Sequence, residues 1–230
     1  MATKRTAQEL IQGARIAPEI FTLRPDYRAL LMVVESIPPG PSNTTSETML
    51  QEAEHHIKTL ISKSPITSFP HIAAWREAYK SFGAKPNKTR NSLEALTRRA
   101  EGGLPRVNRL TDIYNAISVK HQIPLGGEDL DKYDGAPFLI RATGTESFQT
   151  FSGGEPLVEN AAPGEPVWWN WRQGPRTALT DETTRVLFIL DALEPLSDEG
   201  LLKAADELAA ALKALSPDVR TSQRIIDASS

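Results

Sequence analysis

The stretch LPRVNRLTDIYNAISVKHQIPLGGEDLD, residues 104–131, decides how this chain folds. Its apolar residues recur at steps of three and four, the period of a helix that buries one face. They are Val107, Leu110, Ile113, Tyr114 and Ile117. The sequence therefore predicts a central amphipathic helix, followed by a turn at Gly126-Gly127 that ends in a cluster of carboxylates.

Polar residues form a second row on the same helix. Asn108, Asp112 and Asn115 are spaced by four and three residues, so they share one stripe of the helix surface. Such a row can form the floor of a polar site beside the core. It can equally consist of solvated or capping residues that fix the helix to the neighbouring loop. Spacing alone leaves both interpretations open.

Composition excludes several classes of protein. The chain has 230 residues, enough for one large domain with a sizeable core, and a net charge of −3. It contains no cysteine, which excludes disulfides, thiolate catalysis and cysteine–metal sites. No apolar run reaches the roughly 18 residues of a membrane span, and the N-terminal residues lack the apolar segment of a secretory signal. We expect a cytoplasmic protein with no membrane partner.

Strands and helices are expected to follow one another irregularly along the chain. Short apolar runs predict strands at 29–34, 138–140, 147–151, 167–172 and 184–192. Helical spacing and capping residues predict helices at 46–61, 69–83, 92–102 and 197–215. Because no regular strand–helix–strand repeat is present, the predicted class is α+β in a single domain. That domain is placed at 18–217, between a flexible N-terminal segment (1–17) and a polar tail (218–230), with a loop at 153–166.

Charge is distributed unevenly along the chain. Residues 76–109 contain nine Lys or Arg and three Glu, a local net charge of +6, whereas residues 181–218 carry about −6. This polarity favours a face that meets a polyanion. The basic residues are Arg76, Lys80, Lys85, Lys88, Arg90, Arg98, Arg99, Arg106 and Arg109. Basic loops and acidic helices are also common on surfaces that bind nothing, so the alternative is a solvated face.

Chemistry is indicated by two further clusters. The first is a group of carboxylates after Gly126-Gly127, which consists of Glu128, Asp129, Asp131 and Asp134. These carboxylates can bind a cation or cap the turn. Tryptophans gather near Arg172, where they can line a pocket, stack on a base or belong to the core, at Trp168, Trp169 and Trp171. The chain has no P-loop, HExxH or GxSxG pattern, and its four scattered histidines do not indicate a metal site.

Three motifs follow one another along the chain. They are NRLTDIYNAISV at 108–119, PLGGEDLD at 124–131 and LIRATGTESF at 139–148. In this order and spacing they resemble the B3/B4 domain of the phenylalanyl-tRNA synthetase β subunit, whose patterns run approximately N-x-V-V-D-x-T-N-Y, P-L-H-x-F-D-L-D and I-x-V-R-x-A. The run WNWRQGPRTALTDETTRVLFILDA is similar to that domain's glycine-rich hairpin and the strand after it. The resemblance covers about residues 65–195 and implies a mixed sheet with flanking helices.

The resemblance also implies a function. In the synthetase the domain hydrolyses the ester of tRNA that carries the wrong amino acid. Freestanding relatives resemble deacylases that act in trans, some of them on arginine tRNA charged with canavanine. This chain would then deacylate mischarged aminoacyl-tRNA, with tRNA as its partner and with no metal or cofactor. Ester hydrolysis of this kind needs a positioned water and a stabilised oxyanion.

Residue roles follow from the same resemblance. Asp129 and Asn115 are expected to be catalytic, and the basic residues of 76–109 are expected to contact tRNA phosphates. The substrate-binding residues are expected to be Asn108, Asp112, Glu128, Arg141, Trp169 and Arg172.

One departure separates this chain from the family pattern. Gly126 stands where the pattern has histidine, so the role of that histidine does not carry over. Loss of an imidazole and gain of Glu128 predict a larger, more acidic pocket that suits a cationic side chain. Two alternatives remain open: a non-catalytic RNA-binding module of the same fold, and an amino-acid sensor or small-molecule enzyme.

Overall fold

The structure, a computed structural model, describes residues 5–152, 155–169 and 176–230. Its helices are α1 (Ala7–Gly13), α2 (Pro18–Leu23), α3 (Thr44–Ile61), the 3₁₀ helix η1 (Ile66–Ser68), α4 (Pro70–Ser81), α5 (Ser92–Ala100), α6 (Arg109–His121) and α7 (Asp198–Lys213). Its strands are β1 (Arg15–Ile16), β2 (Arg28–Glu35), β3 (Leu125–Asp129), β4 (Phe138–Arg141), β5 (Ser147–Ser152), β6 (Glu155–Asn160), β7 (Pro166–Trp169), β8 (Val186–Ala192) and β9 (Arg220–Ile226). This mixture confirms the predicted α+β class. Within the described ranges, no helix has the length and apolar character needed to cross a membrane.

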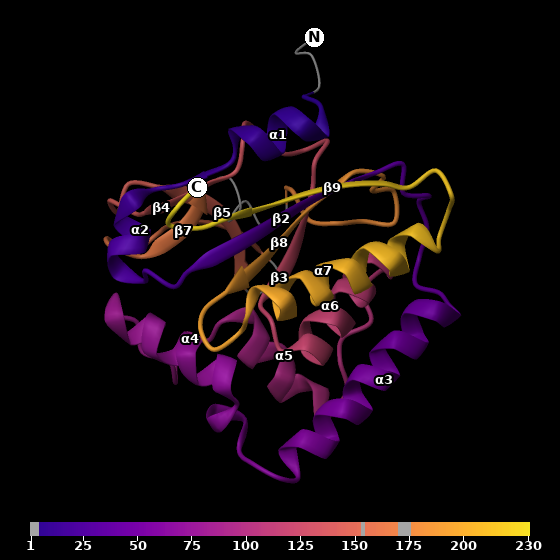
Figure 1. Cartoon of the computed structure of the whole chain (residues 1–230), viewed down its shortest axis with the longest axis horizontal. Coiled ribbons are helices and arrows are strands. Elements are labelled where there is room, and N and C mark those ends of the chain that lie inside the picture. Colours follow the sequence, from indigo (N-terminus) through magenta and orange to yellow (C-terminus); the bar gives the residue numbers. More distant parts are fainter. Residues whose placement is uncertain (1–4, 153–154, 170–175) are drawn as a thin grey trace.

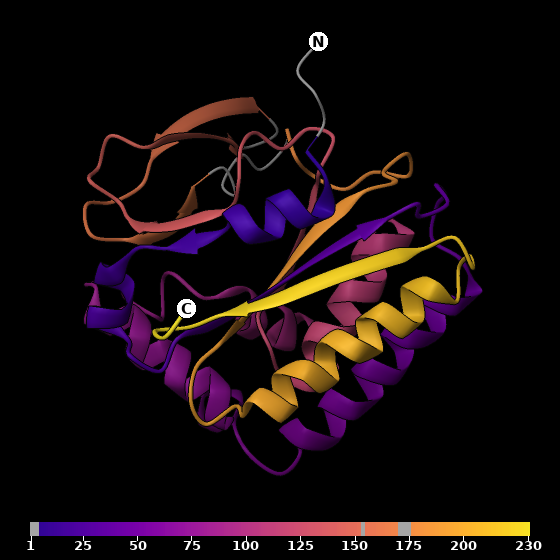
Figure 2. The same cartoon turned by 45° about the horizontal axis from the view of Figure 1, so that its top comes forward.

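Four antiparallel strands in the order β3-β8-β2-β9 form the central sheet. Helices α6 and α7 cover one of its faces, and α3 packs against α6 on the outside (Figure 1). On the opposite face lie α1 and the three-stranded sheet β1-β4-β7 (Figure 2). The hairpin β5-β6 forms a separate two-stranded sheet. The central sheet is therefore covered on both faces.

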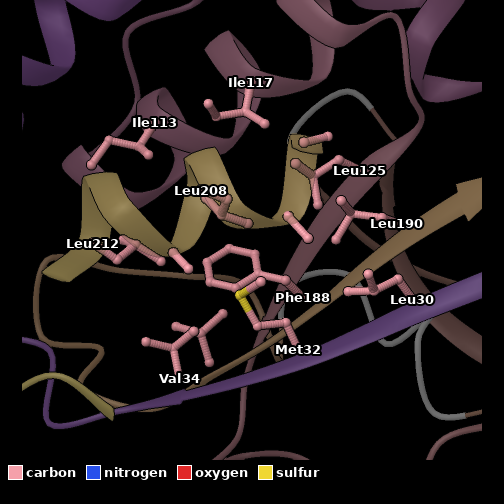
Figure 3. Packing of buried hydrophobic residues seen from close by; sticks show 14 of the residues in the cluster. Leu30, Met32, Val34, Ile113, Ile117, Leu125, Phe188, Leu190, Leu208 and Leu212 are labelled. Carbon is pink, nitrogen blue, oxygen red and sulfur yellow. The ribbon is translucent and has the colours of Figure 1, made fainter. Parts of the chain in front are cut away.

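Strand β2 carries the apolar run predicted at 29–34, and every residue of that run is 0% exposed. Its even-numbered side chains pack against the helices α6 and α7 together with those of β8, as Figure 3 shows for Leu30, Met32, Val34, Phe188, Ile113, Ile117, Leu208 and Leu212. Its odd-numbered side chains join the cluster formed with α1 and β4. Each fully buried aliphatic side chain stabilises the fold by about 1.5–3 kcal/mol. Since β2 buries such side chains on both of its faces, it holds the layers on the two sides of the sheet together.

The turn predicted at Gly126-Gly127 is wrong, because both glycines lie inside strand β3. Gly127 pairs directly with Phe188 of β8. A Cβ atom at residue 127 would lie 2.9 Å from Cε1 of Phe188, a distance that real Cβ contacts essentially never show. The glycine makes room for a ring on the neighbouring strand and does not mark a change of chain direction.

Both ends of the chain contain regular structure that the sequence did not predict. The expected polar tail contains β9, which pairs with β2 over the whole range Arg220–Ile226. The segment 1–17, expected to be flexible, contains α1, and its Leu10 and Ile11 are buried against the central sheet. Likewise β6 lies within the expected loop at 153–166. The strands β6 and β9 are ordered by hydrogen bonds between backbone groups, and this pairing needs no apolar pattern in the sequence.

Candidate functional site

A cavity of about 570 Å³ lies at the β3 edge of the central sheet. Helices α4 and α5 enclose it together with β3, β7 and the end of β8. Six aromatic residues belong to its wall: Tyr27, Trp75, Tyr79, Phe82, Tyr114 and Trp168. The charged side chains on the wall are Arg24, Arg99, Glu128, Glu165 and Asp191. Ligand sites in proteins span roughly 300–1,000 Å³, so this cavity suits a small organic group such as an amino-acid side chain.

The register of β3 against β8 places two carboxyl groups on one face of the sheet. Glu128 pairs with Leu187 and Gly126 with Ile189, while the N–H of Asp191 donates to the carbonyl of Pro124 at 3.0 Å. Because alternate residues of a strand share a face, Glu128, Gly126 and Asp191 point the same way. Gly126 lies between the two carboxyl groups and contributes no side chain, so ligand space is left there.

Glu128 is a buried carboxyl group with spare hydrogen-bonding capacity. It is 7% exposed, and its Oε2 has no partner among the described residues. Burial raises the pKa of Glu128 to about 8, opposed by the nearby Thr177 hydroxyl and assisted by the charge of Asp129. Thr177 lies close enough to favour the ionised form but completes no hydrogen bond of normal geometry. At pH 7 Glu128 is therefore mainly protonated and can donate a hydrogen bond to a ligand.

Asp191 is the second deep carboxyl group. The hydroxyl of Tyr27 donates to its Oδ1 at 2.5 Å, and Nε1 of Trp168 donates to the same oxygen at 3.4 Å. Burial raises the pKa of Asp191 to about 6, although both hydrogen bonds favour the ionised form. The residue is partly buried and lines the cavity. At pH 7 Asp191 is mainly ionised.

His71 ties the aromatic wall to the end of β8. Its Nε2 accepts hydrogen bonds from Nε1 of Trp75 and from the backbone N–H of Leu193, both at 3.1 Å. Since both partners are donors, Nε2 carries no proton, and Nδ1 donates to the carbonyl of Gln122 at 2.7 Å. Burial lowers the pKa of His71, which keeps the ring neutral. The imidazole thus links α4, the end of α6 and β8.

Of the predicted polar row, the structure brings only Asn115 to the cavity. Asn108 is the N-cap of α6: its Oδ1 accepts from the N–H of Thr111, and its Nδ2 donates to the carbonyl of Leu179, both at 2.9 Å. Asp112 is fully buried and accepts from the N–H of Val107 at 2.8 Å and the hydroxyl of Ser42 at 2.5 Å. These contacts fix the start of α6, as capping residues do.

Asp129 also lies off the cavity wall. Because adjacent residues of a strand project to opposite faces, its side chain points away from that of Glu128. Its Oδ2 accepts a hydrogen bond from the hydroxyl of Thr183 at 2.9 Å and pairs with Nζ of Lys132 at 3.0 Å. Oδ1 accepts from the N–H of Asp131. Asp129 therefore closes the loop after β3 and is not placed to reach a group in the cavity.

Of the three residues expected on the opposite wall, the structure describes only the side chain of Arg141. Arg141 is exposed, and its Nε donates to the carbonyl of Gly164. The side chain of Trp169 and the whole of Arg172 lie outside the described residues. Trp168, the preceding residue of β7, lines the cavity. Period-two spacing separates the two faces of this strand but does not indicate which face meets the core.

Most of the predicted phosphate-binding residues are held by acidic partners. Glu94, 1% exposed, pairs with Arg76 and Arg98 at 2.9 Å and lies 3.8 Å from Arg90. Arg106 pairs with Glu47 and Glu54, Lys80 with Glu77, and Arg109 donates to the carbonyl of Pro38. The remaining three, exposed and without ion pairs to the described residues, are Lys85, Lys88 and Arg99. Arg99 also lines the cavity, so it joins the basic face to the site.

Sequence reasoning missed Asp191 and its donor Tyr27, and it named Trp168 only as one of the clustered tryptophans. One signal was available: Asp191 is the single charged residue in the apolar strand Val186–Ala192. A carboxylate at such a position is rarely buried without a partner. Its partner Tyr27 lies 164 residues away in the sequence, so the pair is visible only after folding.

Comparison with known protein families is consistent with this geometry. A family model for the B3/4 domain matches residues 74–215, more than half of the chain. The matched range includes α5, α6, β3 and β8, which contribute Arg99, Asn115, Glu128 and Asp191 to the cavity. A comparison with curated proteins gives no significant match.

Proposed function

The chain belongs to the B3/4 domain family, and on this basis we propose that it is a freestanding hydrolase that deacylates mischarged aminoacyl-tRNA in trans. The family is associated with tRNA binding and with editing in aminoacyl-tRNA synthetases. The proposed substrate is a tRNA that carries a cationic non-cognate amino acid, such as arginine tRNA charged with canavanine.

The observation that carries the proposal is the cavity that holds Glu128 and Asn115 together. Hydrolysis of an aminoacyl ester needs hydrogen-bond donors aimed at the developing oxyanion, and a positioned water. Protonated Glu128 has a free oxygen, and the Asn115 amide makes no hydrogen bond with the described residues. We assign to these two side chains the orientation of the ester carbonyl. Asp129 has no part in this proposal, because Lys132 and Thr183 hold its carboxylate.

Lys85, Lys88 and Arg99 are the proposed contacts to the tRNA backbone. If three phosphates are neutralised, log K for tRNA should fall with log salt at a slope of roughly −2 to −3. Replacing all three residues by Ala should bring the slope close to zero. Arg106→Ala is the matched control, because its guanidinium is already held by Glu47 and Glu54. An unchanged slope in the triple variant would move the tRNA contact elsewhere.

Deacylation itself is tested with a panel of mischarged tRNAs, including arginine tRNA charged with canavanine. The purified chain should release the amino acid faster than spontaneous hydrolysis for at least one cationic amino acid. Glu128→Gln keeps a donor and should retain activity, whereas Glu128→Ala should lose it. Glu52→Gln, on the exposed surface of α3, serves as the control. Release at the spontaneous rate across the whole panel would remove the hydrolase proposal.

A non-catalytic tRNA-binding module is the second candidate. It is favoured by Gly126 in place of the family histidine and by the engagement of Asp129 in structural contacts. This candidate predicts retention of tRNA on filters at low salt with no deacylation. An amino-acid sensor would retain no tRNA under the same conditions.

A further inference from the structure

We propose that Asp191 is the docking point for a cationic group of the ligand, inside a frame made by Tyr27, Trp75 and Trp168. The inference rests on the proposed function for the claim that the ligand is an esterified amino acid. The docking point itself is derived from the geometry of the cavity.

The hydrogen bonds to Asp191 leave one of its oxygens open. Tyr27 and Trp168 both donate to Oδ1, which fixes the plane of the carboxylate. Oδ2 makes no hydrogen bond with the residues that the structure describes, and Asp191 lines the cavity. Tyr27 remains a donor throughout the accessible pH range, because burial raises its pKa well above the ordinary value. The free oxygen is thus held in one orientation.

Among the residues that the structure describes, no cation on the cavity wall compensates Asp191. Arg24 is held by Asp26, at 2.5 and 2.8 Å, and by the carbonyl of Ala74. Arg99 is exposed on α5 and makes no ion pair with the described residues. The other acidic groups of the wall are Glu128, mainly protonated at pH 7, and Glu165, which accepts from the N–H of Ala162. A deep carboxylate without a counter-charge is costly, and a ligand cation would offset that cost.

The aromatic frame suits an organic cation better than a metal ion. Tyr27 and Trp75 meet edge to face with their ring centroids 6.4 Å apart, and Trp168 reaches Asp191 through its indole N–H. His71 accepts from Trp75 and from the N–H of Leu193, so it fixes the indole of Trp75 relative to the end of β8. Guanidinium and alkylammonium groups are attracted to aromatic faces as well as to a carboxylate.

An esterified amino acid offers two cations of this kind, the α-ammonium group and a cationic side chain. Three probes separate them in calorimetric titrations with the full chain. L-argininamide carries both groups and lacks the free carboxylate, as the ester does. Citrullinamide has a neutral side chain of the same shape, and Nα-acetyl-argininamide lacks the α-ammonium group. Whichever neutral analogue loses affinity identifies the cation that docks at Asp191.

The variant Asp191→Asn keeps an acceptor for Tyr27 and Trp168 but removes the charge. We expect argininamide to bind it about tenfold more weakly or worse, whereas the control Asp206→Asn, on the exposed side of α7, should bind normally. In the unaltered protein, affinity should fall about tenfold between pH 7 and pH 5, because a carboxyl group with a pKa of about 6 is then only about one-tenth ionised. This second measurement needs no variant. Near-ultraviolet circular dichroism at both pH values checks that the protein stays folded.

Equal affinity for all three probes would overturn the proposal. So would normal binding by a folded Asp191→Asn variant, an unchanged affinity at pH 5, or the absence of any binding. The outcome is separable from deacylation. Binding through Asp191 without deacylation would refute the hydrolase and leave the docking point intact. Deacylation that survives Asp191→Asn with unchanged KM would refute the docking point alone.

Discussion

Replacing Gly127 by Ala tests whether a close cross-strand contact, and not a turn, requires glycine in β3. An ideal Cβ at this position would lie 2.9 Å from Cε1 and 3.0 Å from Cδ1 of Phe188, and 3.0 Å from Cδ1 of Leu179. Phe188 is 0% exposed and also meets Tyr114 edge to face, at 6.1 Å between ring centroids. The ring therefore has little room to move away from an added methyl group.

The expected cost follows from the kind of adjustment. A forced side-chain rotation costs about 0.5–1.5 kcal/mol, and overpacking of a full core costs about 1–3 kcal/mol. We expect a loss of about 2 kcal/mol in the free energy of unfolding, measured by urea denaturation with an unchanged m-value. For a chain of this length that is about 4–8 °C in Tm. Because the adjustment also moves Glu128, the affinity of the cavity for argininamide should fall as well.

Gly102→Ala is the control for the conformational freedom of glycine. The nearest atom to a Cβ at residue 102 is 3.9 Å away, so the space is open. That variant should be neutral or stabilised by up to about 1 kcal/mol, because alanine lowers the conformational entropy of the unfolded chain. If Gly127→Ala behaves like this control, with a loss below about 0.5 kcal/mol, the explanation of β3 by cross-strand contact is refuted.

Three further outcomes are expected. Glu128→Gln should flatten the dependence of stability on pH. Burial raises the folded pKa of Glu128 to about 8, above the ordinary value of 4.5. The contribution of Glu128 to stability is therefore present below pH 4.5 and is lost as the pH rises through 8. Urea midpoints from pH 5 to pH 9 measure it, and parallel curves for both proteins would contradict it. Asp112→Ala should cost about 2–3 kcal/mol in guanidinium unfolding, because Ser42 and Val107 lose a buried acceptor; a loss near zero would mean that the two donors find other partners. Tyr27→Phe removes a donor that favours ionised Asp191, so the midpoint of the pH dependence of argininamide binding should rise above about 6; an unmoved midpoint would show that burial alone sets it.

The features that could be predicted from the sequence are those encoded locally. The apolar run at 29–34 appears as β2, and the periodic helix appears as α6 with Leu110, Ile113 and Ile117 buried, because a strand or helix buried on a sheet needs its own residues to be apolar at its own period. Val107, the first residue of the predicted apolar face, precedes α6 and is exposed. The strand β9 could not be predicted in this way. Its sequence RTSQRII is largely polar, and it is ordered by backbone pairing with β2, a partner almost 200 residues earlier.

The site was predictable only in part, because its residues also depend on contacts with distant segments. Spacing placed Asn108, Asp112 and Asn115 on one stripe, but a stripe runs along the helix and meets different neighbours at each turn. The first two residues meet the loops around the start of α6, and only Asn115 reaches the cavity. The double glycine was misread because its requirement comes from Phe188 on another strand. Such a requirement depends on the register of β3 against β8, which cannot be read from the sequence of either strand alone.

The size of the cavity has a thermodynamic consequence. Empty space inside a protein costs about 24 cal/mol per Å³, so 570 Å³ of vacuum would cost about 14 kcal/mol. That is as much as the entire free energy of unfolding of a typical domain, about 5–15 kcal/mol. We therefore expect the folded chain to keep this space hydrated, with the unpartnered oxygen of Asp191 among the polar groups that can bind the water. Recognition there is an exchange of solvent for ligand. Across a series of ligands, affinity should follow how completely each one replaces the hydrogen bonds of the displaced water, more closely than it follows ligand size.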